Sequence, residues 1–276
     1  WFIILDEFGK YLEFASKNYP EKELYFVQLL AEFANDDNND VFFINTLHQS
    51  FDSYALGLDL QQRKEWDKVK GRFKELAFNE PVEQLLHIAV EHLGSNESTL
   101  EQERANTIVS LIDESHVFPF NTELNADLVR KLNPLEPVSA SIVALSLQTY
   151  GQNERSLFSF LNSDDERGLL EFDSLSGSMY GVAQVFDYLI YNHHSVLISK
   201  YNPHFVQWNS IRSALERTEK EFKQHTHQYI SIVKTIGLLN IFSSSAAEID
   251  RKFLTQYFNV VSAIKNADEL INNLEK

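Results

Sequence analysis

The chain has 276 residues, enough for one large domain or for two to three small ones. Hydrophobic residues make up 43% and charged residues 23%, a composition typical of globular rather than disordered proteins. The 24 Lys and Arg residues are outnumbered by 40 Asp and Glu, and the net charge of -16 argues against a DNA-binding surface spread over the whole chain. The absence of cysteine excludes disulfide scaffolds and zinc-thiolate sites. No apolar run reaches the roughly 20 residues that span a bilayer, so we expect a cytoplasmic protein.

The first 78 residues alternate between strand and helix patterns. Trp1–Leu5 is a continuous apolar run that suits a strand covered on both faces, and it begins without Met, so we expect a fragment of a longer protein. Helical spacing follows, and Pro20 divides it into two helices. A second buried strand, a helix and a third strand are predicted over Val41–Leu47, Phe51–Val69 and Phe73–Phe78. This alternation predicts an α/β domain with a parallel sheet over residues 1–78.

Helical patterns dominate after Pro81. No convincing strand interrupts residues 79–170, and residues 171–276 are again largely helical. The clearest helices are predicted over Pro81–Leu93, Ile108–Ile112, Ala126–Leu132, Ser139–Tyr150, Glu154–Leu161, Val182–Ile190, Trp208–His225 and Tyr229–Leu239. We therefore expect three domains, of which the first is α/β and the other two are helical, and a fold that is mostly α overall.

The first strand ends in two acids, Asp6 and Glu7. A parallel strand delivers the residues at its carboxyl end to the crevice where ligands bind. There one carboxylate can hold Mg²⁺ through water, and the next can orient or deprotonate a water beside a phosphate. The FIILDE segment resembles the Walker B motif of P-loop ATPases. The alternative is a strand that ends in two solvated acids.

The second strand also ends in polar residues, Asn45 and Thr46. The order of strand, helix and strand with a polar end resembles the AAA+ ATPases, in which such a residue senses the γ-phosphate or the attacking water. The resemblance implies this role for Asn45 or Thr46. Their alternative role is to begin a loop.

Two arginines extend the resemblance. Arg72, in KGRF before the predicted third strand, resembles an arginine finger that acts on a neighbouring subunit, and the FNEP segment with Pro81 resembles the junction of core and lid. Arg155, in YGQNERSL, resembles the sensor 2 arginine of the lid, which grips phosphate oxygens. The alternatives are a cation at a helix carboxyl end for Arg72 and a solvated helix start for Arg155.

These segments occur in the order typical of AAA+ and STAND-like ATPases. The GQNERSLFSFL and IVKTIGLLNIF segments also resemble large bacterial ATP-binding proteins encoded in phage-defence gene clusters. The resemblance implies a nucleotide-driven switch or motor with ATP and Mg²⁺ as ligands, a homo-oligomer, and a protein effector or partner. A winged-helix-like unit in the last domain would admit nucleic acid, which the charge does not support.

One departure from the family concerns phosphate binding. The sequence contains no G-x-x-x-x-G-K-[ST] loop, and its only Gly-Lys pair, Gly9-Lys10, follows the two acids. We therefore expect the phosphate loop to precede Trp1 in the parent protein and this chain alone to bind ATP poorly. The alternative function is a non-enzymatic, acidic helical module that binds a protein partner.

Overall fold

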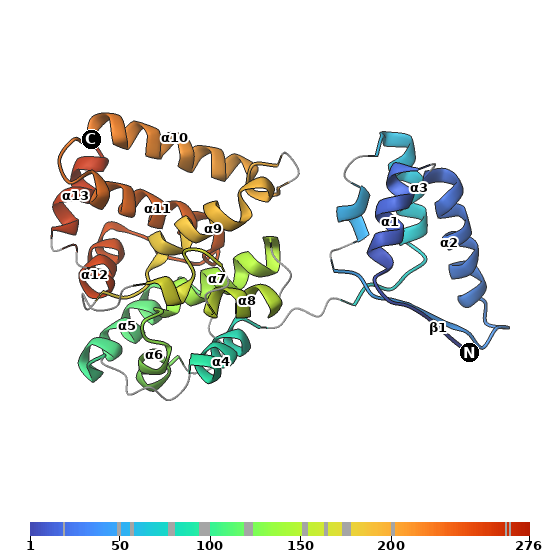
Figure 1. Cartoon of the computed structure of the whole chain (residues 1–276), viewed down its shortest axis with the longest axis horizontal. Helices are drawn as coiled ribbons and strands as arrows, with labels where there is room; N and C mark the ends of the chain where they lie inside the picture. The colour runs from blue at the N-terminus through green and yellow to red at the C-terminus, as the bar shows by residue number, and fades with distance from the viewer. Residues whose placement is uncertain are drawn as a thin grey trace. The chain divides into compact units, whose positions relative to one another are not determined.

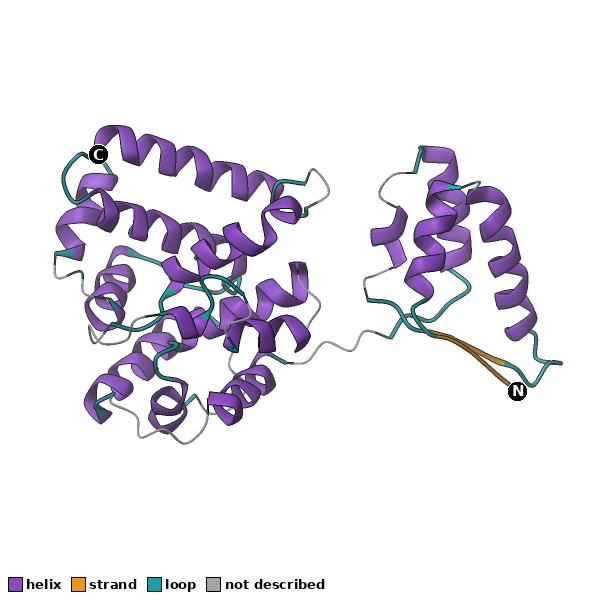
Figure 2. Cartoon of the chain, viewed as in Figure 1, coloured by secondary structure: helices purple, strands orange, loops and turns teal. Residues whose placement is uncertain are grey.

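The computed structural model describes most of the chain. The described residues are 1–18, 20–48, 51–55, 58–76, 81–93, 100–118, 124–150, 154–162, 165–172, 178–199, 202–262, 264 and 266–276. Helices predominate among them, together with one sheet of two parallel strands (Figure 2). The chain divides into two compact units, Trp1–Phe78 and Asn79–Lys276. None of the helices in these ranges has the length and apolar character that a bilayer crossing requires.

The first unit follows the predicted order of strand, two helices and strand. Its elements are β1 (Phe2–Leu5), α1 (Phe8–Lys17), α2 (Pro20–Ala34), β2 (Phe42–Asn45), the 3₁₀ turn η1 (Phe51–Ala55) and α3 (Leu60–Lys70) (Figure 1). Pro20 begins α2, in agreement with its predicted role as a divider, because proline is tolerated in the first turn of a helix. The prediction that residues 51–69 are mostly helical is confirmed, with η1 and α3 as separate elements and a capping box at Asp59 before α3.

The two strands pair in parallel with Phe2 opposite Phe42 and Leu5 opposite Asn45. Figure 1 shows α1, α2 and α3 on one side of this sheet. The side chains on the other face are therefore exposed, at 69% for Phe2, 62% for Ile4, 62% for Phe42 and 45% for Ile44. The prediction of strands covered on both faces is wrong for the described residues, because helices cover only one face.

The predicted third strand is also wrong over the part that the structure describes. Residues 73–76 form no strand, and residues 77 and 78 lie outside the described ranges. The Phe73 ring lies 5.6 Å from the Phe43 ring and 6.1 Å from the Phe51 ring. This segment thus joins the first unit through side-chain packing in place of a backbone ladder.

The core of the first unit forms between its helices and η1. Trp66 of α3 is fully buried, its ring lies 5.1 Å from Phe51, and its Nε1–H donates to the Phe51 carbonyl at 3.1 Å. Phe8 and Leu12 of α1 and Leu24 of α2 belong to the same cluster. This core holds α1 in place directly after the end of β1.

The described residues of the second unit form helices joined by loops, with one isolated bridge between Leu135 and Tyr180 and no strand. Its elements are α4 (Val82–Leu93), α5 (Gln102–Ser115), α6 (Ala126–Leu132), α7 (Pro137–Tyr150), α8 (Glu154–Leu161), the 3₁₀ turn η2 (Leu169–Glu171), α9 (Val182–Leu197), α10 (Phe205–Glu221), α11 (Thr226–Phe242), α12 (Arg251–Val261) and α13 (Ala267–Leu274).

Helix α7 lies inside the second unit and is apolar nearly all round, as expected of a fully buried helix. Its buried serines satisfy their hydroxyls locally, since Ser141 Oγ donates to the Pro137 carbonyl at 2.8 Å and Ser146 Oγ to the Val143 carbonyl at 2.9 Å. One hydrophobic cluster runs from Leu85 to Ile271. The ranges 79–170 and 171–276, which the sequence predicts as lid and C-terminal domain, share this cluster.

His193 of α9 gives the second unit a predicted dependence of stability on pH. Burial lowers the pKa of His193, and its Nε2 has no hydrogen-bond partner among the described residues. The unfolded chain takes up a proton near pH 6.5, whereas the folded unit resists protonation, so stability falls as the pH drops through this value. We expect the melting temperature to fall between pH 7.5 and 5.5 in the wild-type chain, and to fall less in His193→Phe.

The control for this experiment is His194→Phe, because His194 is the exposed neighbour on the same helix. Thermal unfolding of each variant at both pH values measures the effect. An equal fall in melting temperature between pH 7.5 and 5.5 in the wild-type chain and in His193→Phe would contradict the prediction.

Candidate functional site

The candidate site lies at the carboxyl ends of β1 and β2, where the chain leaves each strand. Asp6 and Glu7 follow β1, and Asn45 and Thr46 end and follow β2. Because the strands are parallel and Leu5 pairs with Asn45, these four residues lie at the same end of the sheet. The structure thus brings together four of the six residues that the sequence singles out.

A direct hydrogen bond connects the two strand ends. Thr46 Oγ1 donates to Asp6 Oδ1 at 2.6 Å, and the Glu7 backbone N–H donates to Thr46 Oγ1 at 3.1 Å. Asp6 Oδ1 also accepts from the Glu7 backbone N–H at 3.0 Å. The Thr46 hydroxyl, followed by the Glu7 N–H, lowers the pKa of Asp6, so this exposed carboxylate is ionised at neutral pH.

Glu7 adopts an uncommon backbone conformation at the start of α1. Its φ of 54° and ψ of 35° lie in the left-handed region, where residues other than glycine are rarely found. Its carboxylate forms an ion pair with Lys10 one turn later, and this hydrogen bond lowers the pKa of Glu7. Because its pKa is lowered, the Glu7 carboxylate is ionised at neutral pH. Both side chains are exposed, so this carboxylate is also accessible to solvent.

Asn45 is half-buried, and its amide oxygen Oδ1 has no hydrogen-bond partner within the described ranges. A buried polar atom without a partner costs free energy unless a water or a ligand satisfies it. Asn45 is therefore the one residue of this site with an unused buried acceptor in the part of the chain that is described.

Gly9 and Lys10 have local roles. A Cβ at Gly9 would overlap the Tyr54 side chain, so this position admits Tyr54 against the first turn of α1. Lys10 pairs with Glu7. This Gly-Lys pair is part of a helix and of its packing, in accord with its poor match to a phosphate-binding loop.

Arg72 is not part of the cluster around Asp6. Its Nε donates to Glu32 Oε1 at 2.9 Å, and its backbone carbonyl accepts from Asn35 Nδ2 at 2.8 Å. Glu32 lies in the last turn of α2, which leads into β2, whereas Asp6 and Thr46 lie where the strands end. The structure therefore places Arg72 beside the end of α2.

Arg155 belongs to the second unit, in the first turn of α8. Its side chain lies outside what the structure describes, as do residues 151–153 before it. Its predicted role as a lid arginine stays a prediction.

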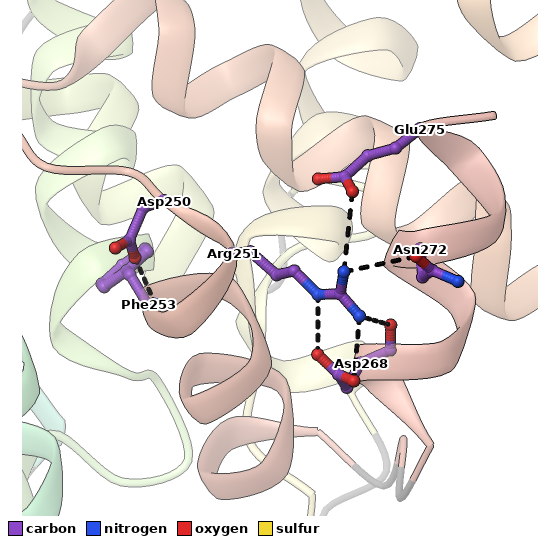
Figure 3. Close-up of polar contacts among 6 residues, drawn as sticks. All are labelled: Asp250, Arg251, Phe253, Asp268, Asn272 and Glu275. Carbon is purple, nitrogen blue, oxygen red and sulfur yellow. Dashed lines mark hydrogen bonds and ion pairs between the residues drawn. The ribbon is translucent and has the colours of Figure 1, made fainter.

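Three basic residues of α11 and α12, which are Lys234, Arg251 and Lys252, form ion pairs with acids. Arg251 donates from Nε and Nη2 to the two carboxylate oxygens of Asp268 at 2.7 and 2.9 Å, and its Nη1 lies 3.3 Å from Asn272 Oδ1 (Figure 3). Lys234 Nζ lies 2.6 Å from Asp187 Oδ1, and Lys252 Nζ lies 3.9 Å from Glu114 Oε2. Helices α11 and α12 belong to the region predicted as a winged-helix-like unit. Each of these three cations is already paired with an acid, so none of them is free to bind a nucleic-acid phosphate.

The described ranges contain no group of three or more His, Asp or Glu side chains that could hold a metal ion by itself. The two carboxylates of the Asp6 site are fewer than a metal cage built from protein alone requires, although Mg²⁺ sites that also use substrate phosphates need only one or two. Comparison of the chain with protein-family models, with curated proteins and with solved structures finds no match.

Proposed function

We propose that residues 1–78 are the distal part of a P-loop-type ATPase core and that the intact protein hydrolyses ATP as a nucleotide-driven switch or motor. The observation that carries this proposal is the 2.6 Å hydrogen bond from Thr46 to Asp6, which joins the ends of two neighbouring parallel strands. Open sheets of parallel strands bind ligands at this end. Acidic and amide oxygens meet here, as a Mg-nucleotide site requires.

The donor set fits the acidic half of such a site. Asp6, Glu7 and Asn45 offer oxygen atoms, which are the ligands that Mg²⁺ prefers. The ion would neutralise charge on the phosphates. The sequence supplies no glycine-rich phosphate loop, so the proposal requires another segment of the intact protein to hold the phosphates.

Each residue of the site has a role in the proposal. Asp6 holds the ion through water. Glu7 orients the attacking water, and its lowered pKa suits this role, because phosphoryl transfer requires positioning more than strong proton abstraction. Asn45 accepts a hydrogen bond from the attacking water through its unused amide oxygen.

The exposed face of the sheet supports the same proposal. Purely parallel sheets are usually covered on both faces, and two-stranded sheets are marginal by themselves. Phe2, Ile4, Phe42 and Ile44 expose an apolar face that further elements of a larger core would cover.

The roles of the two arginines follow from the resemblance alone. Arg72 would have to leave Glu32 to act across a subunit boundary, and Arg155 would bind phosphate from the second unit. The homo-oligomer and the role in anti-phage defence rest on the same resemblance.

Thermal unfolding of the intact protein with Mg-ATP, with Mg-ADP and without nucleotide tests the proposal. Binding to the folded state alone adds about 2.7 kcal/mol to the free energy of unfolding at a ligand concentration 100 times Kd. We expect Mg-ATP to raise the melting temperature and Asp6→Asn to remove the part of the shift that depends on Mg²⁺. The control is Asp37→Asn, which changes an exposed acid in the loop between α2 and β2.

The absence of any nucleotide response in the intact protein would contradict the proposal. It would favour the alternative of a non-enzymatic, acidic helical module that binds a protein partner.

A further inference from the structure

Thr46 makes more hydrogen bonds to the turn after β1 than any other described residue of the site. Its hydroxyl donates to Asp6 Oδ1 at 2.6 Å and accepts from the Glu7 backbone N–H at 3.1 Å. Its own backbone N–H donates to the Leu5 carbonyl at 3.1 Å, and its carbonyl accepts from the Phe8 N–H at 3.1 Å. The residue that follows β2 thus fixes the four residues with which β1 ends and α1 begins.

This turn contains a conformation that needs support. The left-handed Glu7 backbone costs on the order of 1 kcal/mol relative to an ordinary one, and such residues persist where their surroundings hold them. Since the Thr46 hydroxyl binds the Glu7 N–H directly, it stabilises the conformation that sets the direction of the Glu7 side chain.

The hydroxyl of Thr46 is also fully used as a donor. A threonine hydroxyl has one O–H to donate, and Thr46 donates it in the hydrogen bond to Asp6 Oδ1. It therefore has no proton to donate to a phosphate oxygen unless Asp6 is released. Asn45 differs, because its buried amide oxygen has no partner in the described part of the chain and can accept a hydrogen bond from a water.

We propose that Thr46 is a positioning residue, which fixes the Asp6 carboxylate and the Glu7 backbone, and that Asn45 accepts a hydrogen bond from the attacking water. This assignment rests on the proposed function of the same site. It separates the two residues between which the sequence alone leaves the sensor role open.

The first test needs no nucleotide. Thr46→Val keeps the shape of the side chain but removes the hydroxyl, whereas Thr46→Ser keeps the hydroxyl. In the 276-residue chain we expect amide hydrogen exchange at Glu7 to be roughly 3- to 10-fold faster in Thr46→Val and unchanged in Thr46→Ser. The Glu7 N–H also donates to Asp6 Oδ1, but Thr46→Val removes the hydroxyl that holds this carboxylate in place as well. The Phe8 amide is the internal control, because it binds the Thr46 backbone carbonyl in both variants.

The second test uses ATP turnover by the intact protein. Loss of a residue that orients a metal ligand costs about 10- to 100-fold in activity. We expect Thr46→Val to lower kcat by this factor with the ratio of ATP to ADP affinity unchanged, and Thr46→Ser to restore kcat. Asn45→Ala should also lower kcat, because it removes the acceptor that holds the attacking water, but it should leave amide exchange at Glu7 unchanged.

Three results would overturn the assignment: unchanged Glu7 exchange in Thr46→Val, a loss of ATP over ADP preference in Thr46→Val, or equal damage by Thr46→Ser and Thr46→Val. These outcomes differ from failure of the proposed function, which would show as no nucleotide response in the wild-type protein while the exchange result still stands.

Discussion

Replacing Glu7 by glutamine in the intact protein is expected to abolish ATP turnover and to leave ATP binding in place. Glutamine keeps the size of the side chain but removes the charge that orients and polarises the attacking water. Misplacement of a reacting group costs about 10²-fold in rate, so we expect kcat to fall by at least about this factor. Steady-state turnover and the Mg-ATP-dependent shift in melting temperature measure the two properties separately.

Two control variants sharpen this experiment. Lys10→Gln breaks the ion pair with Glu7 but keeps the carboxylate, and exposed pairs of this kind contribute little energy, so turnover should stay within about threefold of wild type. Glu75→Gln removes an exposed acid outside the site. Unchanged turnover in Glu7→Gln, or an equal loss in Lys10→Gln, would refute the catalytic role of the Glu7 carboxylate.

Glu136→Ala is expected to destabilise the second unit by about 3 kcal/mol or more, because it leaves several buried donors without an acceptor. Glu136 is fully buried at the start of α7. Its carboxylate accepts from the backbone N–H groups of Val138 at 2.8 Å and Ser139 at 2.6 Å, and from the hydroxyls of Ser139 at 2.5 Å and Tyr257 at 2.7 Å. These contacts connect the amino end of α7 to α12.

The protonation of Glu136 reflects two opposing causes. Burial raises the pKa of Glu136, and the hydrogen bonds from Ser139, Tyr257 and Val138 oppose this effect. Since the carboxyl pKa is raised in the folded state, ionisation above the ordinary value near 4.3 lowers stability as the pH rises.

Hydrogen exchange of the α7 amides and urea unfolding of the 276-residue chain measure this effect. Tyr257→Phe removes a single donor and should cost about 1 kcal/mol, so it provides a reading if Glu136→Ala fails to fold. Glu91→Ala is the matched control, because the Glu91 side chain is exposed on α4, and it should change stability by no more than about 0.5 kcal/mol. A similarly small effect of Glu136→Ala would contradict the prediction.

The sequence determined much of the local structure. Helices α6 and α8 lie within the predicted ranges, and Pro20 separates α1 from α2 as predicted. Helical periodicity and proline act over a few residues, so a local pattern suffices to predict them. The acids at the end of the first strand were also visible, because an apolar run followed by Asp6 and Glu7 is a local signal.

Other expectations failed because they depended on distant partners. The FKELAF segment alternates like a strand, yet Phe73 packs on Phe43 and Phe51 and residues 73–76 join no sheet. The role of Glu136 was not predicted, since a Glu before a proline gives no local indication that it will be buried and bound by Tyr257, 121 residues later.

Most helices, the two strands and the acidic end of β1 were thus predictable from local sequence, since each depends on residues close together in the chain. Only the tertiary structure decided that the Thr46 hydroxyl binds Asp6, that Arg72 binds Glu32 and that one face of the sheet is exposed. These features depend on contacts between residues about 40 positions apart, whose geometry local propensity does not encode.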